Sequence, residues 1–178
     1  MLEVLVTIVI LAFGMLGLAG LQSRIFTAEM ESYQRAQAVV LMNSMVERIN
    51  ANRTAAATYV GAPLGTGDAQ PTDCSGVAAG VARDQCEWSN ALKGAAETSG
   101  GNNVGGMIGA LGCVTLVQAE VNTLGVCTPG IYLVTVAWQG LNATSSPSAT
   151  CGQGTFGSDD RFRRTISTRV SIGLPVCY

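Results

Sequence analysis

The run MLEVLVTIVILAFGMLGLAGL, Met1–Leu21, decides the fold. It is almost entirely apolar and carries a single charge, Glu3, close to its beginning. A helix rises about 1.5 Å per residue, so roughly 20 apolar residues are needed to cross the hydrocarbon core of a bilayer. The run reaches that length. We therefore expect residues 1–21 to form a helix that can span a membrane.

A cleavable signal peptide is a poor explanation of this run. Signal peptides begin with a basic segment and end at a small-residue cleavage site after a shorter apolar core. Here neither lysine nor arginine precedes Arg24, and an acidic residue, Glu3, stands near the start. We expect the apolar helix to be retained as a working part of the protein.

The helix is expected to continue past the apolar run. Residues 22–53 contain neither proline nor glycine, and Glu31 and Arg35 have the favourable order for an ion pair one turn apart. We predict one helix from about Leu2 to Asn52, whose first half projects and whose second half packs on a domain. Apolar residues recur at the three- and four-residue steps of an amphipathic helix: Leu21, Ile25, Ala28, Ala36, Val39, Met42, Val46 and Ile49.

Three glycines, Gly14, Gly17 and Gly20, follow one another at three-residue steps in the projecting half. Small residues on one face allow close packing of helices in a membrane. Glycine inside a helix also costs up to about 1 kcal/mol relative to alanine, so this stretch could unwind when it leaves lipid. The sequence favours neither interpretation over the other.

Composition excludes several classes of function. The chain has no histidine, which rules out a Ser-His-Asp triad, a Cys-His dyad and any imidazole metal site. We expect a non-enzymatic protein with no catalytic, cofactor-binding or metal site. The net charge of −2 also argues against an electrostatic nucleic-acid binder. A group of arginines near the C-terminus is adjacent to Asp159 and Asp160, so a solvated strand face is favoured there over a nucleic-acid site; the group is Arg161, Arg163, Arg164 and Arg169.

The six cysteines favour an oxidising compartment such as the periplasm or the cell surface, since none forms a close CxxC pair. A short helix is expected where Val81, Trp88 and Leu92 share a face. Six cysteines allow about 15 connectivities, and we choose one of them. The predicted pairs are Cys74–Cys86, which staples the loop before that helix, Cys113–Cys127, which flank a turn, and Cys151–Cys177, which tie a loop to the tail.

The last third of the chain is expected to form an antiparallel sheet. Cys113–Val117 is a candidate strand, and Ile131–Trp138 is apolar on both faces, as in a covered central strand. Arg161–Ile172 alternates polar and apolar residues, as in a half-buried strand. We divide the chain into residues 1–21 and 22–53 (the apolar and amphipathic halves of the helix), 54–112 (a loop region with a short helix) and 113–178 (the sheet and a disulfide-tied C-terminal region).

The N-terminal stretch MLEVLVTIVILAFGMLGLAGLQ, Met1–Gln22, resembles the type IV pilin superfamily. Mature members begin with a phenylalanine and carry glutamate as the fifth residue. The resemblance places Glu3 at that glutamate and implies two residues before Met1. It further implies processing by prepilin peptidase and N-methylation of the first mature residue.

Other stretches look like the PilV-type minor pilins of Gram-negative bacteria. The N-terminal motif is shared with type II secretion pseudopilins, whereas the C-terminal motifs favour the PilV group. The stretches are ILAFGMLGLAGLQ (Ile10–Gln22), ERINANR (Glu47–Arg53), VAWQG (Val136–Gly140), CGQGTFG (Cys151–Gly157) and RRTISTRV (Arg163–Val170).

The resemblance implies an α+β type IV pilin fold, with the long helix packed on a C-terminal antiparallel sheet. It implies that the subunit waits in the inner membrane with a periplasmic C-terminal domain and later joins an extracellular filament. Its partners would be other pilin subunits, other minor pilins and prepilin peptidase. Glu3 would pair with the N-terminal amine of a neighbouring subunit and set the axial register. Before assembly, Glu3 at the lipid headgroups would be favoured by the helix dipole.

The function implied is that of a minor pilin that helps to initiate pilus assembly and to counter retraction. Adhesion, twitching motility and DNA uptake are roles of the family as a whole. The alternatives are a major pilin or a type II secretion pseudopilin, which the sequence does not separate. A membrane-anchored periplasmic enzyme or binding protein would need a polar constellation that the sequence does not show.

Overall fold

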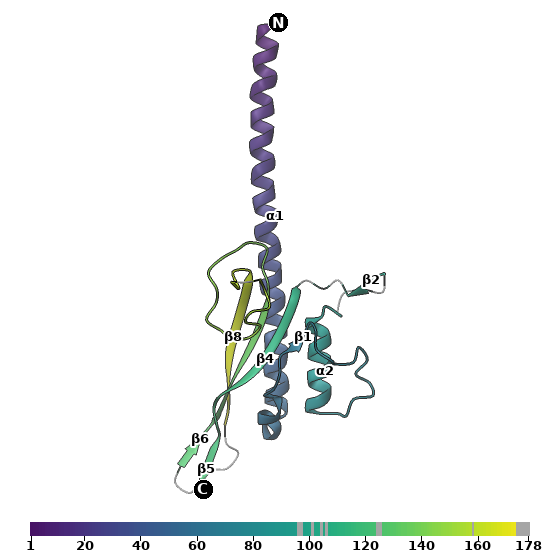
Figure 1. Cartoon of the computed structure of the whole chain (residues 1–178), viewed down its shortest axis with the longest axis vertical. Coiled ribbons are helices and arrows are strands. Elements are labelled where there is room, and N and C mark those ends of the chain that lie inside the picture. The colour runs from purple at the N-terminus through teal and green to yellow at the C-terminus, as the bar shows by residue number, and fades with distance from the viewer. Residues whose placement is uncertain are drawn as a thin grey trace.

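The computed structural model describes residues 1–95, 98–100, 102–103, 105, 107–123, 126–157 and 159–173. A long helix projects from a head that contains its second half, a shorter helix and an antiparallel sheet (Figure 1). This arrangement confirms the predicted α+β class. The elements in chain order are α1 (Leu2–Ala51), the 3-10 helix η1 (Arg53–Tyr59), β1 (Leu64–Gly65), α2 (Val81–Leu92), β2 (Thr98–Ser99), β3 (Asn102–Asn103), β4 (Ile108–Gln118), β5 (Val121–Thr123), β6 (Val126–Thr128), β7 (Gly130–Gln139) and β8 (Arg163–Ile172).

α1 is one unbroken helix of 50 residues, on the order of 75 Å long. Its bounds agree with the predicted Leu2 to Asn52 within one residue, because no proline interrupts the run. At its end the backbone N–H of Asn52 donates to the carbonyl of Arg48. η1 then leads the chain away from the helix axis.

The main sheet has the strand order β1-β4-β7-β8, and every neighbouring pair in it is antiparallel. β7 and β8 pair along their whole lengths, from Gly130 opposite Ile172 to Gln139 opposite Arg163. The three predicted strands are therefore present, although β4 begins earlier than predicted. Two small hairpins, β2 with β3 and β5 with β6, were not predicted.

The sheet has two covered faces, because alternate residues of a strand point to opposite sides. Even-numbered residues of β4 and β7, such as Val114 and Val136, join the main core with α1 and α2. Odd-numbered residues face the connection between β7 and β8 instead. They form a second, smaller hydrophobic cluster with residues of that connection. Its members are Leu111, Cys113, Ala137, Cys151 and Phe156.

The helix face that α1 buries differs from the predicted stripe. Met42 and Ile49 are buried as expected, but Ala36, Leu21, Ile25 and Ala28 are exposed. The head covers only the second half of α1, so the first three apolar positions of the stripe have nothing to pack against. The buried face instead includes a polar and a small residue, Gln34 and Ala38, which the predicted stripe does not contain. The buried side chains of α1 are Gln34, Ala38, Met42, Met45 and Ile49.

Trp88 of α2 joins the two helices and the sheet. Its side chain is 1% exposed, and its Nε1–H donates to the carbonyl of Leu41 on α1 at 2.8 Å. Its ring lies against Gly112 of β4, where a Cβ atom would come within 2.2 Å of Trp88 Cη2. Glycine at position 112 is therefore required for α2 to pack on the sheet. The predicted buried face through Trp88 and Leu92 is confirmed.

The structure contains the predicted Cys74–Cys86 disulfide but pairs Cys113 with Cys151. The predicted pairs Cys113–Cys127 and Cys151–Cys177 are therefore wrong. Cys113 points to the sheet face that the β7–β8 connection covers, which brings its Cα within 5.8 Å of the Cα of Cys151. Cys127 lies on the separate β5–β6 hairpin and is itself disulfide-bonded, while Cys177 lies outside the described residues.

Candidate functional site

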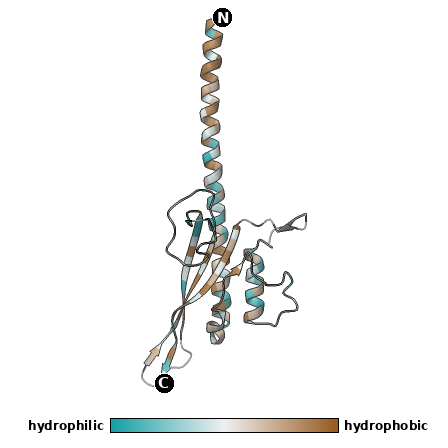
Figure 2. Cartoon of the chain, viewed as in Figure 1, coloured by the Kyte–Doolittle hydropathy of each residue, from teal (hydrophilic) through white to brown (hydrophobic). Residues whose placement is uncertain are grey.

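The projecting part of α1 is an apolar rod without any cover. Every residue from 1 to 26 is exposed, a length of roughly 39 Å. The side chains of Leu5, Leu11 and Phe13 are 66%, 64% and 72% exposed. Figure 2 shows the apolar colour running along this rod and giving way to mixed polarity near the head. Among the described helices, α1 alone is long and apolar enough to cross a membrane.

Glu3 is the one charged side chain in this rod before Arg24, and it lies in the first turn of α1. The unpaired N–H groups and the dipole of the helix favour a carboxylate at that end. In the part of the chain that the structure describes, Glu3 forms no ion pair within the subunit. Its side chain is thus available to a group outside the subunit.

Gly14, Gly17 and Gly20 all lie inside the continuous helix. A Cβ atom added at any of them would meet nothing within 4 Å. No contact within the subunit therefore requires glycine at these positions, although each one weakens the helix.

An apolar stripe continues from the rod along the outer side of α1 in the head, and the sequence analysis missed it. Phe26 and Val40 are 64% and 63% exposed, and Met30 and Tyr33 lie between them, also exposed. Gln37 completes the stripe, and its Nε2 donates to the hydroxyl of Tyr33 at 3.1 Å. The steps of three and four residues place all five on one side of the helix. We call these residues the α1 stripe.

Where α1 enters the head, Glu31 fastens it to the β7–β8 connection. The Glu31 carboxylate accepts from the Nη2 of Arg164 at 3.3 Å and from the backbone N–H of Asn142 at 3.2 Å. Arg164 Nη2 also donates to the carbonyl of Asn142 at 2.7 Å. The helix spacing had suggested an ion pair between Glu31 and Arg35. In the structure Glu31 pairs with Arg164 instead.

At the other end of α1 a polar cluster fastens the helix to α2. Arg48 Nη1 lies 2.8 Å from both Asp84 Oδ1 and Glu87 Oε2. Asp84 also accepts from Asn52 Nδ2 at 3.2 Å and from the hydroxyl of Tyr59. Burial, reinforced by this hydrogen bond to the Asp84 carboxylate, raises the pKa of Tyr59 to about 12. The head is thus held to α1 at both ends by buried or half-buried polar groups.

A second carboxylate, Asp68, holds the loop before α2. Burial alone would raise its pKa, but hydrogen bonds from Lys93, Ser89 and the backbone of Gly65 outweigh burial and lower the pKa. Ser89 Oγ donates at 2.7 Å and the Gly65 N–H at 2.8 Å. The folded head therefore favours the ionised form of Asp68.

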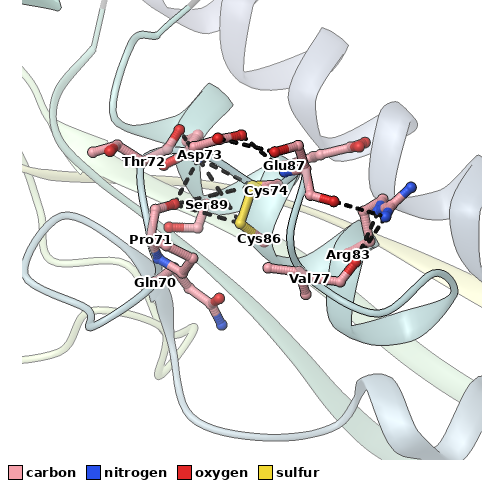
Figure 3. Close-up of a disulfide and its surroundings, with 12 residues drawn as sticks. Gln70, Pro71, Thr72, Asp73, Cys74, Val77, Arg83, Cys86, Glu87 and Ser89 are labelled. Atoms are coloured by element: carbon pink, nitrogen blue, oxygen red, sulfur yellow. Dashed lines mark hydrogen bonds between the residues drawn. A yellow bond between two sulfur atoms is a disulfide. The ribbon is translucent and has the colours of Figure 1, made fainter.

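The Cys74–Cys86 disulfide ties the same loop to the outer side of α2 (Figure 3). Asn90 Nδ2 donates to the carbonyls of Pro71 at 2.9 Å and Thr72 at 3.0 Å. Arg83 Nη2 donates to the carbonyl of Val77 at 2.8 Å. These contacts fix the path of the loop, so the disulfide and its neighbours have a structural role. In the described ranges no three His, Cys, Asp or Glu side chains are grouped so that they could hold a metal ion.

The four C-terminal arginines form the predicted solvated face only in part. Arg163 is 2% exposed and lies beside Asp160, with Nε 3.3 Å from Oδ2. Arg164 forms an ion pair with Glu31. The remaining two, Arg161 and Arg169, are exposed. The prediction is wrong for Arg163 because the β7–β8 connection covers the face of β8 that the alternation assigned to solvent.

Comparison with known proteins gives one match. Residues 20–89 match the family model Tt1218-like, described as Type IV pilin Tt1218. No curated protein and no solved structure matches the chain. The matched segment begins in the apolar rod, contains the whole packed half of α1 and ends in α2. Together with the long N-terminal helix on an antiparallel sheet, this match supports a relationship to the type IV pilin superfamily.

Proposed function

We propose that this chain is a pilin subunit, a minor pilin of the PilV type, which helps to initiate assembly of a type IV pilus. The resemblance of the C-terminal stretches, including CGQGTFG (Cys151–Gly157), supports the minor-pilin role. The observation that carries the role in a filament is the exposed rod of residues 1–26, which is continuous with a firmly packed head.

The rod has two environments in this proposal. Before assembly it lies in the inner membrane, with the head in the periplasm, because lipid covers apolar side chains that the subunit leaves bare. In the filament the same side chains are covered by the rods of other pilins. Burial of a Leu or Phe side chain is worth about 1.5–3 kcal/mol, so a bundle of such rods supplies strong cohesion.

The α1 stripe extends this contact surface into the head. Phe26, Met30, Tyr33 and Val40 continue the exposed apolar surface of the rod without a break. A neighbouring rod that packed along the stripe would cover side chains that the head leaves open. The stripe therefore aligns the head of one subunit with the rod of another.

Glu3 sets the axial register in this proposal. A lone carboxylate inside an apolar bundle is costly unless it is paired. The N-terminal amine of an adjacent mature subunit, released by prepilin peptidase, is the partner that the family resemblance suggests. Pairing in one register only would select the correct stagger between rods.

The test compares Glu3→Ala and Glu3→Val with the unchanged chain in cells that assemble pili. We expect each variant to remain in the membrane fraction and to be lost from the sheared filament fraction. Glu47→Ala, which removes an exposed carboxylate from the head portion of α1, serves as the control and should assemble normally. Normal amounts of the Glu3 variants in sheared filaments would contradict the register role.

Abundance in the same sheared fraction tests the minor-pilin role. We expect far fewer copies of this chain than of the principal subunit. An equal or greater number of copies would make it a major pilin, and its presence in a secretion pseudopilus only would make it a pseudopilin.

A further inference from the structure

The connection between β7 and β8 contains a run of hydroxyl residues around a proline, TSSPSAT, Thr144–Thr150. Sequences rich in serine and threonine with proline are typical of segments that carry O-linked sugars. Ser145, Ser146, Ser148 and Thr150 are all exposed. The run therefore presents several hydroxyl groups on the surface of the head.

Four of these hydroxyls have no role in holding the fold. Within the described part of the chain, the side chains of Ser145, Ser146, Ser148 and Thr150 have no hydrogen-bond partner. Other hydroxyls nearby are engaged, since Thr144 Oγ1 accepts from Arg164 at 2.7 Å, and Thr155 Oγ1 donates to the carbonyl of Gly152 at 2.7 Å. The unengaged hydroxyls are gathered between these two engaged ones.

The backbone of the run is nevertheless held firmly. The buried guanidinium of Arg163 donates to the carbonyls of Pro147 and Cys151, each at 3.0 Å, and to the carbonyl of Ala149. The disulfide from Cys151 to Cys113 fixes the end of the run to β4. A buried arginine and a disulfide thus hold in place a segment in which four hydroxyl side chains, those of Ser145, Ser146, Ser148 and Thr150, form no hydrogen bond with the described part of the head.

We propose that this run is an acceptor site for O-linked glycan, centred on Ser146 and Ser148 at either side of Pro147. In the reaction the serine Oγ attacks the anomeric carbon of a sugar diphosphate donor, carried on a nucleotide or a lipid. A carbon–oxygen bond forms, the bond from the anomeric carbon to the phosphate oxygen breaks, and the diphosphate leaves with the electron pair. The hydroxyl proton passes to a base of the transferase. The product is a bulky polar group on the outer face of the head.

N-linked modification is less well supported by the contacts. Two Asn-x-Thr sequences occur, at Asn52 and at Asn142. The side-chain amide of Asn52 donates to Asp84 and to the Tyr59 hydroxyl at 3.2 and 3.1 Å, so it is occupied. In the second sequence the hydroxyl of Thr144 is held by Arg164. The free serine hydroxyls are the more accessible acceptors.

The experiment is peptide mass spectrometry of the full-length subunit, isolated from membranes of the cells that encode it before it enters a filament. After reduction and digestion, fragmentation that preserves side-chain modifications assigns any added mass to a residue. We expect whole sugar residues on Ser146, Ser148 or their neighbours Ser145 and Thr150.

A variant with all four hydroxyls replaced by alanine should lose the added mass completely and keep the Cys113–Cys151 disulfide. Ser171→Ala, which removes an exposed serine of β8 outside the run, should keep the modification in full. An unmodified peptide from the unchanged subunit, or sugar found only on Asn142, would overturn the proposal. Because unassembled subunits are measured, a failure to join filaments leaves this result unaffected.

Discussion

At the scale of single residues, two residues of the same type can have different structural roles at neighbouring positions. Arg161 and Arg163 are two positions apart, and both seemed to belong to a solvated strand. In the structure Arg161 is exposed, whereas Arg163 is buried beside Asp160 and donates to three carbonyls of the β7–β8 connection. Alternation along a strand predicts which side a residue faces, but it does not reveal that a distant loop covers that side.

This difference predicts unequal effects of two alanine substitutions. Arg163→Ala should lower the free energy of unfolding by about 3–5 kcal/mol, because it leaves the buried Asp160 carboxylate without its charged partner and three carbonyls without their donor. Arg161→Ala, the matched control, should change it by no more than about 0.5 kcal/mol, since Arg161 is exposed and its ion pair with Asp159 is long, at 3.8 Å. Denaturant titration of the full chain in detergent micelles measures both. Equal losses for the two variants would contradict the assigned role of Arg163.

Tyr59 gives a prediction about pH. Its pKa is raised from 10.0 to about 12 in the folded chain, by burial and then by the hydrogen bond to Asp84. Because the folded state binds this proton more tightly, the stabilisation is complete below pH 10 and is lost as pH rises through 12. The free energy of unfolding should therefore fall across that window, and Tyr59→Phe should remove most of this dependence. An unchanged pH profile in Tyr59→Phe would show that other groups cause the alkaline loss.

At the scale of elements, α1 was the part that the sequence predicted best. Local sequence, above all the absence of proline, was enough to predict a long helix here, and its bounds were correct within one residue. The face that packs depends on the partner surface, and here it includes Gln34 and Ala38, which apolar periodicity did not predict. The outer α1 stripe could have been found by asking which apolar residues remain after the packed face is removed.

The stripe should matter for assembly and not for folding. Val40→Glu places a charge on the stripe, where a neighbouring rod would bury it at a high cost, so the variant should be strongly depleted from sheared filaments. Val60→Glu is the matched control, because Val60 is also an exposed valine but follows η1 and lies off α1. Both variants should unfold at the same denaturant concentration as the unchanged chain. Full incorporation of Val40→Glu into filaments would contradict the proposal that the α1 stripe lies in the interface between subunits.

The disulfides show a limit of prediction from spacing. Cys74 and Cys86 are 12 positions apart and were correctly paired, since a short loop brings its ends together easily. Cys113 and Cys151 are 38 positions apart, and their contact depends on the β7–β8 connection folding back over the sheet. Neither cysteine spacing nor strand periodicity contains that information.

At the scale of the whole molecule, the subunit combines a stable head with a rod that depends on its surroundings. The head is fastened to α1 by Glu31 at one end and by Arg48 at the other. Within the described part of the chain, residues 1–26 are exposed and no other element covers the rod, and Gly14, Gly17 and Gly20 weaken it further. Unwinding is therefore expected to be confined to the rod, while the head keeps its fold.

Replacing all three glycines by alanine should separate the two roles of the rod. Each replacement favours the helix by up to about 1 kcal/mol, and none creates a contact within the subunit. We expect normal membrane insertion and an unchanged head. We also expect fewer subunits in filaments, because the alanines would hinder both close packing of neighbouring helices and unwinding of the rod. Hydrogen exchange of residues 14–20 in filaments distinguishes the two, since fast exchange in the unchanged chain indicates unwinding. Unimpaired incorporation of the triple variant would contradict both roles.

The central claim is that the rod of α1, covered by lipid before assembly, is covered by other pilin rods afterwards. Its most direct test is a photo-crosslinking amino acid at position 11, where Leu11 is 64% exposed in the isolated subunit. In sheared filaments the account predicts adducts between this residue and the N-terminal helix of another pilin subunit. Filaments that contain the chain but give no such adducts, or adducts that join Leu11 to a head surface only, would contradict it.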